Sequence, residues 1–334
     1  MLDGKTILVT GGTGSFGQKL TETLLKRFKP RKIIIFSRDE QKHFSMAQKF
    51  PESQHECLRY FIGDVRDKAR LELAFRDVDY VVHAAAMKHV PLAEYNPIEC
   101  VKTNILGAQN IIEVATAAGV KRVIALSTDK ACNPINLYGA TKLASDKLFI
   151  SANNYARAIY SVVRYGNVIG SNGSVIPYFL RIRNNKVFPI TDQRMTRFWL
   201  SLQESVDFVI SRLIEMQGGE LFVPKIPSMR ITDLAAAIDP DAKLDVIGIR
   251  PGEKLHETLI SVDDARDTWD MKDHYVVVSR SVNKSPPAGA RQVAEDFNYS
   301  SDANDQWISA DQMRSTIFNE LIPQLKASGE LIAP

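Results

Sequence analysis

Three polar residues that could carry out proton transfer, Thr128, Asp129 and Lys130, stand directly after an apolar run. Tyr138 and Lys142 follow, four residues apart at the expected start of a helix, so both side chains point the same way. An ammonium close to a phenol favours the phenolate. We therefore expect Lys142 to lower the pKa of Tyr138 and make it a usable proton acceptor.

These residues need a strand that ends beneath them, because the carboxyl ends of strands line the ligand crevice of open α/β sheets. The run Arg122–Leu126 is predicted to be the fifth strand of such a sheet. Helical patterns separate the strands, among them Pro97–Ala118. Continuous apolar strands alternating with helices predict a doubly wound parallel sheet of the Rossmann type. The four earlier strands are predicted at Lys5–Thr10, Lys32–Phe36, Leu58–Ile62 and Val78–His83.

A glycine-rich turn joins the first strand to the first helix. Gly11 permits a tight turn, Gly14 lets the backbone approach a pyrophosphate, and Gly17 lets the helix pack close to the strand. Backbone N–H groups and the positive end of the helix dipole then face the phosphates. A turn without a ligand is the alternative. The residues assigned to the phosphates are Gly11, Thr13, Gly14, Ser15, Phe16 and Gly17.

The tip of the second strand should distinguish NAD from NADP, since an acidic group there favours NAD and a cationic one accommodates a 2′-phosphate. Arg38 follows Ser37, and Lys42 lies four residues beyond it, which favours NADP. In the alternative interpretation, Asp39 and Glu40 open a helix, and the two cations belong to its solvated face.

The next two strand ends are expected to line the same cofactor. Asp64 is placed to accept a hydrogen bond from the adenine amino group, and Asp67 could cap the following helix. The alanine run after the fourth strand would let the backbone lie against a flat ring, and Lys88 lies where sugar and nicotinamide should meet. The residues assigned here are Asp64, Val65, Ala84, Ala85, Ala86 and Lys88.

Composition narrows the class of protein. A net charge of +3 on 334 residues gives no reason to expect nucleic acid. No apolar run reaches the length of a bilayer span, and no cleavable signal opens the sequence. The three cysteines are far apart, so neither a disulfide framework nor a zinc site is predicted. The histidines lack ligand spacing, and no metal is expected. These features predict a cytoplasmic protein.

Eight stretches carry a clear resemblance: TGGTGSFG, GDVRD, HAAAMKHVP, STDKA, YGATK, RYGNVIGSNGSV, MTRFW and GIRPGEKLHE. Together they resemble the extended short-chain dehydrogenase/reductase family of nucleotide-sugar enzymes. More narrowly, they resemble the inverting UDP-N-acetylglucosamine 4,6-dehydratases, the first enzymes of pseudaminic acid synthesis. The resemblance covers nearly the whole chain. GxxGxxG and YxxxK are shared by the superfamily, whereas the STDKA, MTRFW and RPGEKLHE stretches are narrower.

The resemblance implies a cycle with tightly bound NADP that is regenerated in each turnover. C4 is oxidised, water leaves from C5–C6, and the same hydride returns to C6. By resemblance, Tyr138 is the base at O4, Lys142 holds the ribose, Thr128 hydrogen-bonds O4, Asp129 is the acid for the 6-hydroxyl and Lys130 is the base at C5. Flanking Lys142 and the cofactor charge are expected to depress the pKa of Lys130. Inversion also needs a second proton donor or a water, which the sequence does not identify.

The chain is divided into a predicted NADP-binding Rossmann domain, residues 1–166, and a mainly substrate-binding region, residues 167–334, whose later segments return to the first. Arg197 suits a diphosphate by its charge and its fork of donors. Asn167, Arg250 and Glu253 resemble family contacts to phosphates and ribose, although each of these residues could have a surface or interface role. The predicted substrate contacts are Lys88, Asn167, Thr191, Met195, Arg197, Arg250 and Glu253, and Asn167 is also assigned to the cofactor.

The alternatives to a dehydratase of UDP-N-acetylglucosamine are a UDP-hexose 4-epimerase and a non-catalytic NADP-sensing protein. The 4-epimerases lack the Asp–Lys pair after the threonine, and sensors commonly lack the Tyr/Lys pair. Glucose-type dehydratases carry glutamate where Lys130 stands, and retaining enzymes tend to have methionine where Tyr138 stands. By resemblance, the helices near residues 97–118 and 139–156 pair across a two-fold axis, so a homo-oligomer is expected, a dimer or a dimer-based hexamer.

The alternation of strands and helices is weaker in the second half of the chain. A sixth strand is expected to end in the segment Arg164–Val168, and Val175–Arg183 reads as a helix. Residues Ser285–Gly289 form the clearest loop, and Asp311–Lys326 is expected to be a terminal amphipathic helix.

Overall fold

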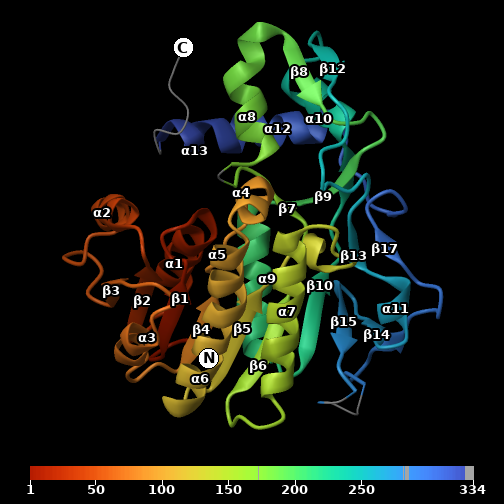
Figure 1. The fold of residues 1–334 in the computed structure, drawn as a ribbon. Coiled ribbons are helices and arrows are strands. Elements are labelled where there is room, and N and C mark those ends of the chain that lie inside the picture. The colour runs from red at the N-terminus through yellow and green to blue at the C-terminus, as the bar shows by residue number, and fades with distance from the viewer. Residues whose placement is uncertain (172, 281, 283–285, 328–334) are drawn as a thin grey trace.

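A ten-stranded sheet forms the centre of the computed structural model, which describes residues 1–171, 173–280, 282 and 286–327 (Figure 1). Its order is β16-β14-β15-β10-β6-β5-β4-β1-β2-β3. The strands from β10 to β3 are parallel, and β15, β14 and β16 continue the sheet antiparallel. The strands are β1 Thr6–Thr10, β2 Lys32–Ser37, β3 Leu58–Ile62, β4 Tyr80–His83, β5 Arg122–Leu126, β6 Ile159–Val163, β10 Glu220–Pro224, β14 Thr268–Asp270, β15 His274–Val278 and β16 Arg291–Gln292.

Helices cover both faces of this sheet because its inner strands are apolar on both sides; β1, for example, is buried along its whole length. α1 and α9 contact each other on one face, and α3, α6 and α7 follow one another on the other. The prediction of a doubly wound parallel sheet is confirmed. The helices are α1 Ser15–Arg27, α2 Glu40–Lys49, α3 Lys68–Ala74, α4 Val90–Tyr95, α5 Pro97–Val101, α6 Gly107–Ala117, α7 Leu137–Ala152 and α9 Leu202–Glu215.

A second hydrophobic core lies beyond the carboxyl ends of the parallel strands, at the top of Figure 1. Its members include Phe179, Phe188 and Leu234, all almost fully buried. The surrounding elements are α8 Val175–Ile182, β8 Val187–Ile190, α10 Ile231–Ile238, β12 Lys243–Val246, α12 Ala310–Thr316 and α13 Ile322–Ala327.

Short strands connect the two cores. β9 (Thr196–Leu200) pairs with β7 (Asn167–Val168) on one side and with β11 (Ser228–Arg230) on the other. β13 (Thr258–Ile260) pairs with β17 (Tyr299–Ser300) and leads into α11 (Val262–Ala265). The strands β10, β14, β15 and β16 bring chain from the second half back to the main sheet. The division at residue 166 stays a prediction.

Three predicted elements differ in detail. The helix expected at Pro97–Ala118 contains a π-helical turn at Lys102–Leu106, and a second π-turn, Ile317–Leu321, separates α12 from α13. The sixth strand ends at Val163 rather than within Arg164–Val168. The chain leaves the sheet there, since Asn167 and Val168 pair with β9 instead. Ser285, the first residue of the predicted loop, lies outside the described residues.

Candidate active site

The glycine turn has the form that a dinucleotide requires. Gly11 has a φ of +65°, and a Cβ there would lie 3.0 Å from the backbone of Ala84 and Ala85. A Cβ on Gly17 would lie 2.4 Å from the carbonyl oxygen of Gly12. The N-cap of α1 is Gly14, which has no side chain to cap the helix, and the first turn holds no acidic residue. The first N–H groups of α1 therefore lack a side-chain acceptor, which fits a pyrophosphate.

The residues predicted for the adenosine end lie around the tip of β2. Thr13 and Ser37 join their hydroxyls at 2.8 Å, which ties the glycine turn to this strand. Arg38 and Lys42 are both exposed. Asp39 caps α2, its Oδ1 accepting from the backbone N–H of Lys42 at 3.0 Å, as the alternative interpretation expected of this acidic residue. The cations remain available at the strand tip.

Asp64, predicted to contact adenine, is paired with arginine. Its Oδ2 lies 2.7 Å from an Nη of Arg66 and 3.9 Å from an Nη of Arg38. Burial raises the pKa of Asp64, but the hydrogen bonds and charge of Arg66, together with Arg38, outweigh this effect and lower the pKa. Asp67 caps α3, as predicted, by accepting from the N–H of Arg70.

Asn104, within the helical pattern Pro97–Ala118, holds the loop that follows the alanine run. Its Oδ1 accepts from Met87 N–H at 2.8 Å, and its Nδ2 donates to the Met87 carbonyl at 3.0 Å and to Thr141 Oγ1 at 3.0 Å. Asn104 lies in the π-turn and is buried. It therefore links the loop between β4 and α4 to α7, the helix that carries Tyr138 and Lys142. A helical pattern alone gave no signal for this role.

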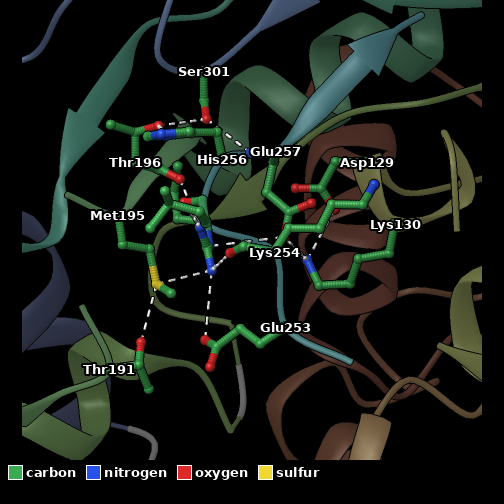
Figure 2. Close-up of polar contacts among 12 residues, drawn as sticks. Asp129, Lys130, Thr191, Met195, Thr196, Glu253, Lys254, His256, Glu257 and Ser301 are labelled. Atoms are coloured by element: carbon green, nitrogen blue, oxygen red, sulfur yellow. Dashed lines mark hydrogen bonds and ion pairs between the residues drawn. The ribbon is translucent and has the colours of Figure 1, made fainter. Parts of the chain in front are cut away.

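Thr128, Asp129 and Lys130 form a compact cluster where β5 ends. Thr128 caps a 3₁₀ turn, Asp129–Ala131. The Oδ1 of Asp129 accepts from Thr128 Oγ1 at 2.9 Å. It also accepts from Lys130 Nζ at 3.0 Å (Figure 2). Only 1% of the Asp129 side chain is exposed. The structure thus places an acid–amine pair at the edge where the fold positions ligands.

Tyr138 and Lys142 lie in the first two turns of α7, and both are buried. The expectation that Lys142 lowers the pKa of Tyr138 is wrong for this arrangement. Burial raises the pKa of Tyr138 to about 12, and the charge of Lys130 opposes this rise only in part. Lys142 instead donates to the carbonyl of Leu126 at 2.7 Å. Burial also lowers the pKa of Lys142.

The expected depression of the Lys130 pKa is wrong as well. Burial lowers this pKa, but two carboxylates outweigh burial and raise it: Asp129, and Glu257, whose Oε1 lies 3.4 Å from Lys130 Nζ. Burial raises the pKa of Asp129. The charge and hydrogen bond of Lys130, together with a hydrogen bond from Thr128, outweigh burial, so the pKa of Asp129 lies below its usual value. The resting pair is therefore an ammonium and a carboxylate.

Four of the predicted substrate residues come together on and beside β9. Arg197 donates through one Nη to the carbonyls of Thr196 and Leu255, and through the other to Lys254 O and Met195 Sδ. Glu253 Oε1 lies 3.5 Å from the guanidinium, and Thr191 Oγ1 donates to Met195 Sδ at 3.1 Å. Figure 2 shows Met195, Lys254 and Glu253 in the same view as the Asp129–Lys130 pair. The cluster brings together Thr191, Met195, Arg197 and Glu253.

Three other predicted contacts come from other segments, although β7, which begins with Asn167, pairs with β9. Arg250 is exposed, and within the described ranges no hydrogen bond or ion pair joins its side chain to Arg197. Lys88 is exposed in the loop after β4, and Asn167 begins β7 and is half-buried. Glu257 was missed, although it ends the RPGEKLHE stretch. Nothing in the local sequence distinguishes it from a surface glutamate, whereas the structure places it, buried, beside Lys130.

Comparisons with known proteins give the family. A family model described as "Polysaccharide biosynthesis protein" matches residues 7–279. The chain belongs to this family. An inverting UDP-N-acetylglucosamine 4,6-dehydratase of Campylobacter jejuni is 55% identical over 332 residues, covering 95% of this chain and 98% of its own. The resemblance drawn from the motifs is thereby confirmed.

Other similar proteins have lower sequence identity to this chain. A UDP-glucose 4-epimerase of Rickettsia bellii is 42% identical over 82% of this chain and 83% of its own. The X-ray structure of Pen from Bacillus thuringiensis has a TM-score of 0.88 at 35% identity, covering 96% of this chain and 99% of that one. Within the part of the chain that the structure describes, no helix combines the length and apolarity that a bilayer crossing requires.

Proposed function

We propose that the protein is a UDP-N-acetylglucosamine 4,6-dehydratase that inverts C5 and forms a UDP-2-acetamido-2,6-dideoxy-β-L-arabino-hexos-4-ulose. The observation that carries this proposal is the ion pair, 3.0 Å long, between buried Asp129 and half-buried Lys130 at the end of β5. Removal of water across C5–C6 needs a base for the C5 proton and an acid for the 6-hydroxyl, whereas epimerisation at C4 needs proton transfer at O4 alone. The 55% identity to a relative with this name supports the same conclusion.

In this proposal Tyr138 removes the proton from O4, and Thr128 holds that oxygen. NADP, when bound, supplies a hydride acceptor for C4 and later the same hydride for C6. The pKa of Tyr138, raised by burial to about 12, must fall when substrate and cofactor enter. Lys142, whose pKa burial lowers, is the cation on the same helix face that can hydrogen-bond the ribose and help to lower it.

Asp129 and Lys130 perform the elimination. In the resting ion pair, Lys130 carries the proton that Asp129 needs to act as an acid. Transfer of one proton across the 3.0 Å contact gives a neutral amine and a carboxylic acid. The amine can then take the C5 proton, and the acid can protonate the departing 6-hydroxyl. The two charged groups neutralise each other in this step, so no unpaired charge is buried.

The finer assignments belong to the same proposal. Arg38 and Lys42 would accommodate the 2′-phosphate of NADP, and Arg197 would approach the substrate diphosphate with Glu253 at the ribose. Two of the three free cysteines are buried and the third is partly so, in keeping with a reducing cytoplasm. A homo-oligomer built on a dimer through the region of α5, α6 and α7 completes the proposal.

Incubation with UDP-N-acetylglucosamine in heavy water tests the function. We expect a product lighter by one water, formed without added reductant, with deuterium at C5 and inverted configuration there. Mass spectrometry of the cofactor released on denaturation should identify NADP. A product without deuterium at C5 would contradict the proposal.

The second candidate is a UDP-hexose 4-epimerase, which the 42% identity to a UDP-glucose 4-epimerase favours. In the same incubation an epimerase would give a sugar of unchanged mass, so one spectrum separates the two functions.

A further inference from the structure

Glu257 is a buried carboxylate in the active site whose role the proposed mechanism leaves open. Glu257 directly precedes β13, and its side chain is 2% exposed. Acidic side chains at this depth are stable only when they are paired or hydrogen-bonded. The partners of Glu257 therefore show what it does.

The backbone of Glu257 is fixed on both sides. Its N–H donates to Ser301 Oγ at 2.9 Å, and its carbonyl accepts from Ser301 N–H at 2.8 Å. The same hydroxyl of Ser301 is hydrogen-bonded to Thr196 Oγ1 at 2.7 Å (Figure 2). The carboxylate consequently starts from a rigid point between β9 and β17.

From that point the carboxylate contacts two cations. Glu257 Oε1 lies 3.4 Å from Lys130 Nζ and 3.8 Å from Arg197 Nε. Its Oε2 is buried without a hydrogen-bond partner, and so is Oδ2 of Asp129. Each carboxylate around Lys130 thus keeps one oxygen available to a group that enters the site.

We propose that Glu257 is a positioning residue, which holds the amine of Lys130 opposite Asp129 and links it to the guanidinium of Arg197. This inference rests on the function proposed above, in which Lys130 is the base at C5 and Arg197 approaches the diphosphate. The charged and titratable groups that face Lys130 are Asp129, Glu257, Arg197 and Tyr138. Among the described residues, Glu257 is the carboxylate within 4 Å of both cations, Lys130 and Arg197.

The first test measures Lys130 directly. Wild type and Glu257→Gln are labelled with trace acetic anhydride at a series of pH values, and the labelling of Lys130 is read by peptide mass spectrometry. Since Gln keeps the shape but loses the charge, the pH at which Lys130 becomes reactive should fall by about one unit. An unchanged labelling profile overturns the proposal. The readout is independent of turnover, so it holds even if UDP-N-acetylglucosamine is not the substrate.

The second test measures turnover of UDP-N-acetylglucosamine against pH. In Glu257→Gln the alkaline limb of kcat, where the ion pair loses its shared proton, should move to lower pH, and kcat at its optimum should fall about ten-fold because the amine is held less firmly. KM should change little, as Arg197 keeps its backbone contacts. A kcat profile equal to that of wild type contradicts the proposal. If wild type itself forms no dehydrated product, the proposed function fails and the labelling result still decides this inference.

Glu253→Gln is the matched control, because Glu253 contacts Arg197 and, among the described residues, makes no ion pair with Lys130. It should raise KM and leave the labelling of Lys130 unchanged. An equal shift in both variants would mean a general charge effect and would overturn the proposal. If Glu257→Gln fails to fold, Glu257→Asp is measured instead, because it keeps the charge on a shorter side chain. Labelling of Lys130 equal to that of wild type, with a lowered kcat, supports the positioning role. A kcat equal to that of wild type contradicts it.

Discussion

The glycine turn and the charge cluster around Lys130 follow two strands of the same sheet, β1 and β5, and are built in different ways. The turn is made from one continuous stretch, Gly11–Gly17, and acts through backbone N–H groups and the absence of side chains. The cluster joins Asp129 and Lys130 to Arg197 and Glu257, which lie far away in sequence, and acts through side-chain charge. A substitution in the glycine turn should therefore impair cofactor binding without altering the charge cluster, and a substitution in the charge cluster should impair turnover without loss of cofactor.

The largest effect is expected from Lys130→Ala. It removes the proposed base at C5, so turnover and C5 deuterium exchange should fall by about a thousand-fold. The content of bound cofactor should stay that of wild type, because Lys130 lies outside the glycine turn. Exchange is read by mass spectrometry and cofactor by absorbance after denaturation. An exchange rate equal to that of wild type would remove the assigned role.

A smaller effect, on stability, is expected from Asp129→Asn. It leaves the ammonium of Lys130 with one carboxylate fewer and should lower the free energy of unfolding by about 3 kcal/mol near neutral pH. Glu257 remains as a partner, which limits the loss. Chemical denaturation of both proteins measures the difference.

The pH dependence of that difference follows from the two shifted pKa values. The lowered pKa of Asp129 contributes stability above its usual value of 3.8, which is lost as the pH falls through the folded pKa. The raised pKa of Lys130 contributes stability below its usual value of 10.5, which is lost as the pH rises through the folded pKa. The gap between wild type and Asp129→Asn should therefore narrow at both extremes. A gap that widens on acidification would show that the ion pair is not its cause.

The smallest effect on stability is expected from Gly17→Ala. The Cβ of the new alanine would lie 2.4 Å from the carbonyl oxygen of Gly12, so α1 must shift. We expect this shift to lower the free energy of unfolding by about 2 kcal/mol. Bound cofactor should be lost, while the pH at which Lys130 becomes reactive should stay unchanged. Thermal melting and the same labelling experiment check both statements. A shift in Lys130 reactivity would show that the two regions are coupled.

Much of this site could be predicted from the sequence because the information is local. The strand–glycine–helix order, the Asp67 cap and the position of Thr128, Asp129 and Lys130 after β5 depend on residues within a few positions of each other. Periodicity and turn chemistry determine such features directly.

The sequence by itself thus determined the doubly wound sheet and the edge at which the chemistry lies. Only the tertiary structure decided the charge states of that site. Burial raises the pKa of Tyr138, and Glu257, brought to Lys130 from 127 positions later in the chain, helps to raise the amine's pKa. Desolvation and long-range ion pairs depend on which segments meet in space, and no local spacing in the sequence specifies that.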